Sequence, residues 1–113
     1  MVNQKEYKAA IYASDKINSK KAYKQLEACK VYALDNGYTI IGEFIDVGYS
    51  KDDDGRKQFK QMLLMAQDYM YEYVIVYQYD RINTSPLGYQ IYEETFSNYG
   101  VKIISITEDV EYY

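Results

Sequence analysis

The 113-residue sequence contains no histidine and no tryptophan, and it has only one cysteine and one proline. Without histidine, an imidazole base and a histidine-ligated metal site are excluded, and we predict neither a metal nor a cofactor. Cys29 has no second cysteine for an internal disulfide, and no apolar signal segment opens the chain. Both features predict a protein of the reducing cytoplasm. No apolar run is long enough to span a bilayer, so we expect no membrane segment.

Cations are also scarce, since 13 basic residues face 17 acidic ones and the net charge is −4. DNA affinity that is independent of sequence depends on cations at phosphates, so we expect the isolated chain to bind DNA weakly if at all. A local basic strip remains at the start of a predicted helix, and it reads either as a backbone contact or as a solvated helix start. Its members are Lys16, Lys20, Lys21 and Lys24.

A chain of this length corresponds to one domain, so we predict a single domain over residues 1–113 with no DNA-binding domain. Short apolar runs alternate with segments of helical spacing, which predicts an α/β fold with an open, mainly parallel sheet and helices on both faces. Strands are predicted at 8–13, 38–46, 71–79 and 101–107, and helices at 20–36, 57–68 and from Ser85-Pro86 to Gly100.

An acidic, glycine-containing segment, "VGYSKDDDG" at residues 47–55, separates the second predicted strand from the second helix. Its glycines and successive aspartates oppose a fixed packed conformation, so we predict that it is the most mobile part of the chain. Arg56 follows this segment directly. We therefore expect the Arg56 side chain to be loosely held.

Polar side chains follow three of the predicted strands. In an open parallel sheet the carboxyl ends of the strands lie at one edge, where ligands bind, so these side chains should converge. An arginine between aspartates suits phosphate binding, and the alternative is that Asp80 caps a turn while Arg81 pairs with Asp46. The residues are Ser14, Asp15 and Lys16 after the first strand, Asp46 after the second, and Asp80 and Arg81 after the third.

Six segments resemble, in order, the catalytic domain of the serine recombinases, the resolvase and invertase family. They are "AAIYAS", "QLEACKVYALDNGY", "GEFIDVGYS", "GRKQFKQML", "YVIVYQYDRINTS" and "GVKIISITEDV". The resemblance implies a resolvase-like sheet of four strands in the order 2-1-3-4. It also implies DNA recombination and integration of the kind found in mobile elements. In this family a serine hydroxyl attacks the scissile phosphate without metal, within a tetramer, while arginines stabilise the developing charge.

The resemblance also implies site residues, since five positions match active-site residues of the family: Gln25, Asp46, Arg56, Asp80 and Arg81. An ungapped alignment puts Ser14 on the first arginine and Lys16 on the nucleophilic serine, whereas a gapped alignment keeps Ser14 as the nucleophile. In either alignment the first arginine is missing. Thr84 replaces another family arginine, and Gln78 replaces a lysine. If each lost arginine costs about 10²-fold, two would reduce cleavage by about 10⁴.

Three functions remain open at this point. The first is an impaired recombinase-like domain that acts by protein interaction or regulation, as a homodimer or in association with a recombinase. The second is an active recombinase domain that cleaves DNA through Ser14, with its DNA-binding part missing. The third is a small-ligand binder that uses the crevice at the strand ends, although no glycine-rich phosphate loop follows the first strand.

Overall fold

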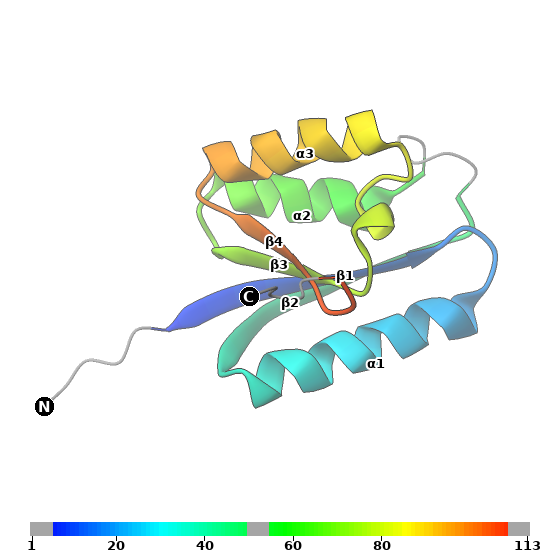
Figure 1. The fold of residues 1–113 in the computed structure, drawn as a ribbon, viewed down its shortest axis with the longest axis horizontal. Coiled ribbons are helices and arrows are strands. Elements are labelled where there is room, and N and C mark those ends of the chain that lie inside the picture. The colour runs from blue at the N-terminus through cyan, green and yellow to red at the C-terminus, as the bar shows by residue number, and fades with distance from the viewer. Residues whose placement is uncertain (1–5, 50–54, 109–113) are drawn as a thin grey trace, which may run out of the picture.

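The computed structural model describes residues 6–49 and 55–108, which form a sheet flanked by helices (Figure 1). The strands are β1 (Tyr7–Asp15), β2 (Tyr38–Val47), β3 (Tyr73–Val76) and β4 (Lys102–Ser105). The helices are α1 (Ser19–Asp35), α2 (Lys57–Gln67) and α3 (Pro86–Asn98), with a short 3₁₀ turn, η1 (Tyr79–Arg81), after β3. Neighbouring strands pair in parallel in the order β2-β1-β3-β4, which confirms the predicted α/β fold.

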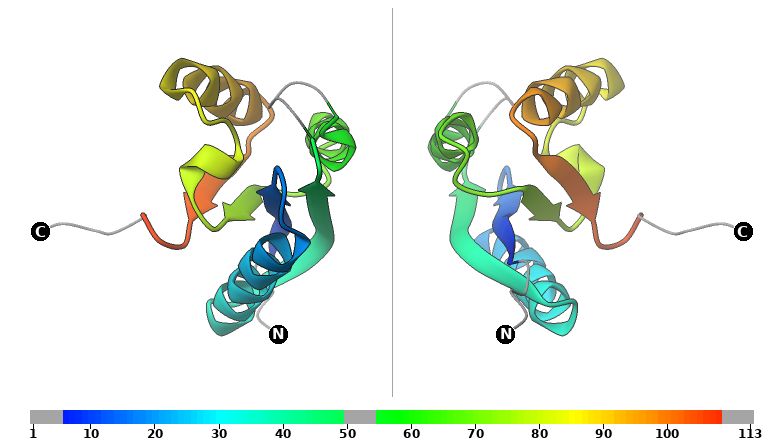
Figure 2. Two further views of the ribbon diagram at one scale, coloured as in Figure 1. Left: turned by 90° about the vertical axis from the view of Figure 1, so that its right-hand side faces the viewer. Right: turned by 90° about the vertical axis from the view of Figure 1, so that its left-hand side faces the viewer.

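The helices cover both faces of the sheet, with α1 on one face and α2 and α3 on the other (Figure 2). Side chains of a strand alternate between faces, and β1 follows this rule. Ala9, Ile11 and Ala13 pack with the core on the α1 face. Ala10 and Tyr12 pack on the α2 and α3 face. β1 is thus buried on both faces, as expected for a central strand of a parallel sheet.

Two predicted strands are shorter in the structure. β3 spans four residues instead of the predicted 71–79, and β4 spans four instead of 101–107. Just past the ends of these strands, one backbone bond continues, from Ile106 N to the Val76 carbonyl, and the Thr107 hydroxyl donates to the Tyr77 carbonyl at 2.7 Å. The chain after β3 then turns into η1.

The helices begin close to their predicted starts. Asn18 caps α1 by accepting from the backbone N–H groups of Lys20 and Lys21. Ser85 caps α3, and Pro86 occupies its first turn, as the sequence predicted. The segment 47–55 was predicted to be the most mobile part of the chain. Its residues 50–54 lie outside the described residues, so this stays a prediction. None of the helices in the described ranges is long and apolar enough to cross a membrane.

Candidate functional site

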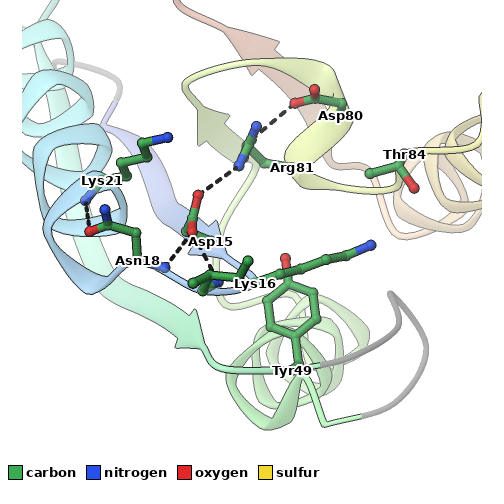
Figure 3. Close-up of a pocket in the computed structure, with 9 residues that line it drawn as sticks. Asp15, Lys16, Asn18, Lys21, Tyr49, Asp80, Arg81 and Thr84 are labelled. Carbon is green, nitrogen blue, oxygen red and sulfur yellow. Dashed lines mark hydrogen bonds and ion pairs between the residues drawn. The ribbon is translucent and has the colours of Figure 1, made fainter.

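The carboxyl ends of β1 and β3 border an open cavity of about 380 Å³ (Figure 3). Arg81 lies between the carboxylates of Asp80 and Asp15, and Thr84 faces the same space. Of the polar residues predicted to converge at this edge, Asp15, Lys16, Asp80 and Arg81 line the cavity, whereas Ser14 and Asp46 do not. The lining consists of Asp15, Lys16, Ile17, Asn18, Lys21, Tyr49, Asp80, Arg81 and Thr84.

Arg81 joins η1 to the end of β1. Its Nε donates to Asp80 Oδ1 at 3.0 Å, and its Nη1 donates to the Ser14 carbonyl at 3.0 Å. The same Nη1 lies 3.9 Å from Asp15 Oδ1. The alternative that Arg81 pairs with Asp46 is therefore wrong. The guanidinium is held on two sides, and 24% of the Arg81 side chain stays exposed at the wall of the cavity.

Asp46 instead caps helix α2 from a neighbouring strand. Its Oδ1 accepts from Gln58 N at 3.0 Å, and its Oδ2 accepts from Phe59 N at 2.9 Å. The residue at the helix start, Arg56, makes no side-chain capping bond, so these N–H groups depend on Asp46. Oδ2 also accepts from the Tyr12 hydroxyl at 2.8 Å. Burial raises the pKa of this hydroxyl, which keeps it protonated and able to donate.

Arg56 is buried and well held, so the expectation of a loose side chain is wrong. Only 1% of the residue is exposed, and Nη1 donates to the Arg81 carbonyl at 3.0 Å. The guanidinium carbon also lies 4.0 Å from the centroid of the Phe59 ring, in cation–π range. Arg56 is absent from the lining of the strand-end cavity, so its guanidinium does not contact a ligand in that cavity.

Ser14 is fully buried in β1, with 0% of its surface exposed. Its backbone N–H donates to Gln25 Oε1 at 3.3 Å, and its carbonyl accepts from Gln25 Nε2 at 3.1 Å and from Arg81. Its hydroxyl makes no hydrogen bond with any described residue. Ser14 pairs with Asp46 across the two strands but does not line the strand-end cavity.

The six predicted site residues therefore lie at one end of the sheet but do not face one space. Ser14, Gln25, Arg56 and Arg81 form one connected cluster around the carbonyls of Ser14 and Arg81. Asp80 lines the cavity, whereas Asp46 caps the start of α2.

Two residues that the sequence reasoning missed support this arrangement. Tyr12, the donor to Asp46, lies two residues before Ser14, and the alternation of β1 would have placed it on the same face. Glu108 holds η1, since its Oε1 accepts from Tyr79 N at 2.6 Å and from the Ser105 hydroxyl at 3.0 Å. Tyr79 and Glu108 are 29 residues apart in the sequence, and no local pattern indicates their contact.

The cavity wall is a mixed charged surface. Backbone N–H groups of Asn18 and Ile17 lower the pKa of Asp15, so this carboxyl is ionised at neutral pH. Lys16, Lys21 and Arg81 supply three positive charges against the carboxylates of Asp15 and Asp80. Such a wall suits a phosphate-sized anion beside Arg81, and its own carboxylates limit the attraction.

The fold and the arginine at the strand ends agree with the resemblance of the sequence motifs. A family model described as "Resolvase, N terminal domain" matches residues 12–113. This chain therefore belongs to the resolvase family of serine recombinase catalytic domains. Comparison with curated protein sequences finds no match.

Solved structures of serine recombinases share the fold. The C-terminal catalytic domain of ISC1926 TnpA, an IS607-like serine recombinase, has a TM-score of 0.79 at 24% identity, over 88% of this chain and 70% of that one. The N-terminal catalytic domain of TP901-1 integrase has a TM-score of 0.83 at 20% identity, over 91% and 80%. A resolvase family site-specific recombinase from Streptococcus pneumoniae has a TM-score of 0.82 at 22% identity, over 93% and 75%. At such identities, these likenesses show the fold alone.

Proposed function

We propose that this chain is a serine-recombinase-type domain of a DNA recombination system whose own DNA cleavage is impaired. It acts by association with recombinase subunits, either copies of itself or a different recombinase. The observation that carries this proposal is the burial of the Ser14 hydroxyl and the Arg56 guanidinium, neither of which lines the strand-end cavity. The proposal also takes residues 1–113 as one catalytic-type domain that works in the cytoplasm.

The first argument concerns the nucleophile. A hydroxyl attacks a phosphate only when its oxygen reaches the phosphorus in line with the leaving group and a base removes its proton. Ser14 has no exposed surface, and no described side chain bonds its hydroxyl to serve as that base. Lys16, the other candidate position, has no hydroxyl. Neither alignment therefore supplies an accessible oxygen in this conformation.

The second argument concerns the charge on the phosphorus oxygens. A metal-free site has to neutralise that charge with fixed cations that face the phosphate. Arg56 faces Phe59, Arg81 is shared with Asp80, and Thr84 stands on the cavity wall where the family has an arginine. The loss of two arginine contacts, at about 10²-fold each, supports a cleavage rate reduced by about 10⁴.

Association is supported by apolar side chains left on two helices. Tyr23, Val31 and Leu34 are exposed on α1, and Leu87 and Ile91 are exposed on α3. Single exposed apolar residues are normal on a protein surface, whereas a group of them on one surface is typical of a protein–protein interface. These helices are the surfaces we propose for subunit contact.

A second candidate function is an active domain that cleaves DNA through Ser14. It is favoured by the cluster that joins Ser14, Arg56 and Arg81 through two carbonyl groups. A hydroxyl that is engaged with no described residue would need no bond broken before a rearrangement of the end of β1 exposed it.

One assay separates the two candidates. The chain is incubated with supercoiled plasmid carrying candidate sites, and a denaturing gel is used to detect a covalent protein–DNA band. We expect no such band, and Ser14→Ala should leave the result unchanged. An active serine recombinase on its own site serves as the positive control. A band with the native chain that Ser14→Ala abolishes would establish the active candidate instead.

A further inference from the structure

The sheet has a second crevice at its carboxyl edge, on the α1 side of Arg81. The chain runs from β1 outward to β2 and then back across to β3, so the strand order reverses between β1 and β3. In open α/β sheets this reversal point is where ligands bind. Here it holds a cavity of about 430 Å³, lined by Asp15, Lys21, Lys24, Gln25, Ala28, Tyr77, Gln78 and Arg81.

The crevice carries an excess of positive charge in an acidic chain. Lys21, Lys24 and Arg81 line it against the single carboxylate of Asp15. That carboxylate is already engaged, because it accepts from the backbone of Ile17 and Asn18 and lies near Arg81. Neither lysine forms an ion pair with a described residue. The crevice therefore holds two lysines beside Arg81, both without an ion pair among the described residues, on a chain whose net charge is −4.

Arg81 contributes a donor that the protein leaves open. Its Nε and Nη1 are bonded to Asp80 and to the Ser14 carbonyl, while its Nη2 makes no hydrogen bond with a described residue. The contact with Ser14 fixes the guanidinium plane at the wall shared by both cavities. A fixed fork with a free N–H group is well suited to a phosphate oxygen.

We propose that this crevice binds a small ligand with a phosphate group of two or more negative charges, such as a nucleoside diphosphate. Lys21, Lys24 and Arg81 bind the phosphates, and Tyr77 with Ala28 forms the apolar wall. The cavity volume falls within the range of ligand sites, about 300–1,000 Å³.

Recognition in this crevice depends on side chains. Asn18 already accepts the N–H groups of Lys20 and Lys21 at the start of α1, so those donors are not available to a phosphate. The absence of a glycine-rich loop therefore does not count against this site. Extended DNA is a poorer occupant, because the acidic chain as a whole repels a long polyanion while the crevice attracts a compact one.

The test is a titration of the isotope-labelled chain with inorganic pyrophosphate and then with ADP, followed by amide NMR at low salt. We expect saturable shifts at Lys21, Lys24 and the segment 77–81, with a dissociation constant of about 1 mM or tighter that weakens as salt is added. Pyrophosphate alone measures the phosphate contacts, and ADP adds the contribution of the apolar wall.

Charge-removing variants locate the site. Lys24→Gln should weaken pyrophosphate binding about fivefold, and the double change with Lys21→Gln should weaken it by more than about tenfold. Lys60→Gln, which removes one positive charge at an exposed position of α2, should change pyrophosphate binding less than about twofold. Both crevice lysines are exposed, so these variants should keep the native amide spectrum.

Three results would overturn the proposal: no saturable shift up to about 10 mM ligand, an equal loss with Lys60→Gln, or shifts produced by DNA only. The outcome is independent of the proposed function, because phosphate binding in this crevice requires neither DNA cleavage nor a second subunit. A negative titration would leave the plasmid assay unaffected, and a covalent DNA band would leave the titration unaffected.

Discussion

Asp46 is the residue whose role differs most between sequence and structure. Its position matches an active-site residue of the family, but its carboxylate accepts from two backbone N–H groups of α2 and from Tyr12. The residue is almost fully buried. Carboxylates at a helix start satisfy unpaired donors and interact favourably with the helix dipole. In this structure, Asp46 stabilises the contact between β2 and α2.

We therefore expect Asp46→Ala to destabilise the fold by about 2–4 kcal/mol, because it leaves several buried donors without an acceptor. Urea unfolding at neutral pH measures this change. Asp68→Ala, at the exposed end of the same helix, is the matched control and should stay within about 0.5 kcal/mol of the native chain. Equal unfolding midpoints for Asp46→Ala and the native chain would show that the cap is energetically unimportant.

At the scale of elements, the connection from η1 to α3 depends on close packing at one glycine. Asn83 is buried, and its Oδ1 accepts from Ser85 N at 2.9 Å. Ser85 in turn caps α3 by accepting from Gly88 N. A methyl group at Gly88 would fall well inside van der Waals contact with the Asn83 side chain. The glycine is thus required by packing, since its backbone is ordinary helix.

Gly88→Ala should destabilise the chain by about 1–2 kcal/mol, although alanine has the better helix propensity by about 1 kcal/mol. Thermal unfolding measures the effect. Ser97→Ala, at an exposed position of the same helix, should be neutral or slightly stabilising. In an Asn83→Ala background the cost of Gly88→Ala should disappear, because the clashing side chain is gone. A cost that persists there would assign the effect to the backbone rather than to Asn83.

At the scale of the whole molecule, charge is unevenly distributed. α1 carries four lysines against two acidic residues, whereas α3 carries two glutamates and no cation. The net charge of −4 still opposes an extended polyanion, and the basic strip of α1 is small. Attraction to duplex DNA requires several phosphate contacts at once, each of which releases counterions.

We therefore expect the chain alone to bind duplex DNA with a dissociation constant weaker than about 10⁻⁴ M at about 0.15 M salt. Fluorescence anisotropy with a labelled duplex measures this affinity. A salt series is the internal control, because few phosphate contacts give a shallow dependence of affinity on salt. Micromolar binding that weakens steeply with salt would contradict this expectation and the view of the chain as a poor DNA binder.

The sequence by itself determined the order and type of the elements, because apolar spacing along a segment is a short-range property. It also determined the start of α3, which the Ser85-Pro86 pair marks, and placed the start of α1 within one residue, at 20 against Ser19. The strand order and the family followed from six motifs in register, and the structure and the family match confirm both.

Only the tertiary structure decided how the candidate site is used. A register shift between Ala9 and Ala10 aligns Ser14 with Asp46, and no local pattern specifies such a shift. Arg56 is held by a carbonyl 25 residues away, and Arg81 by one 67 residues away. Burial and hydrogen bonding depend on which distant segments pack together, so a loop composition that predicts freedom for Arg56 says nothing about the Phe59 ring and the Arg81 carbonyl that hold it.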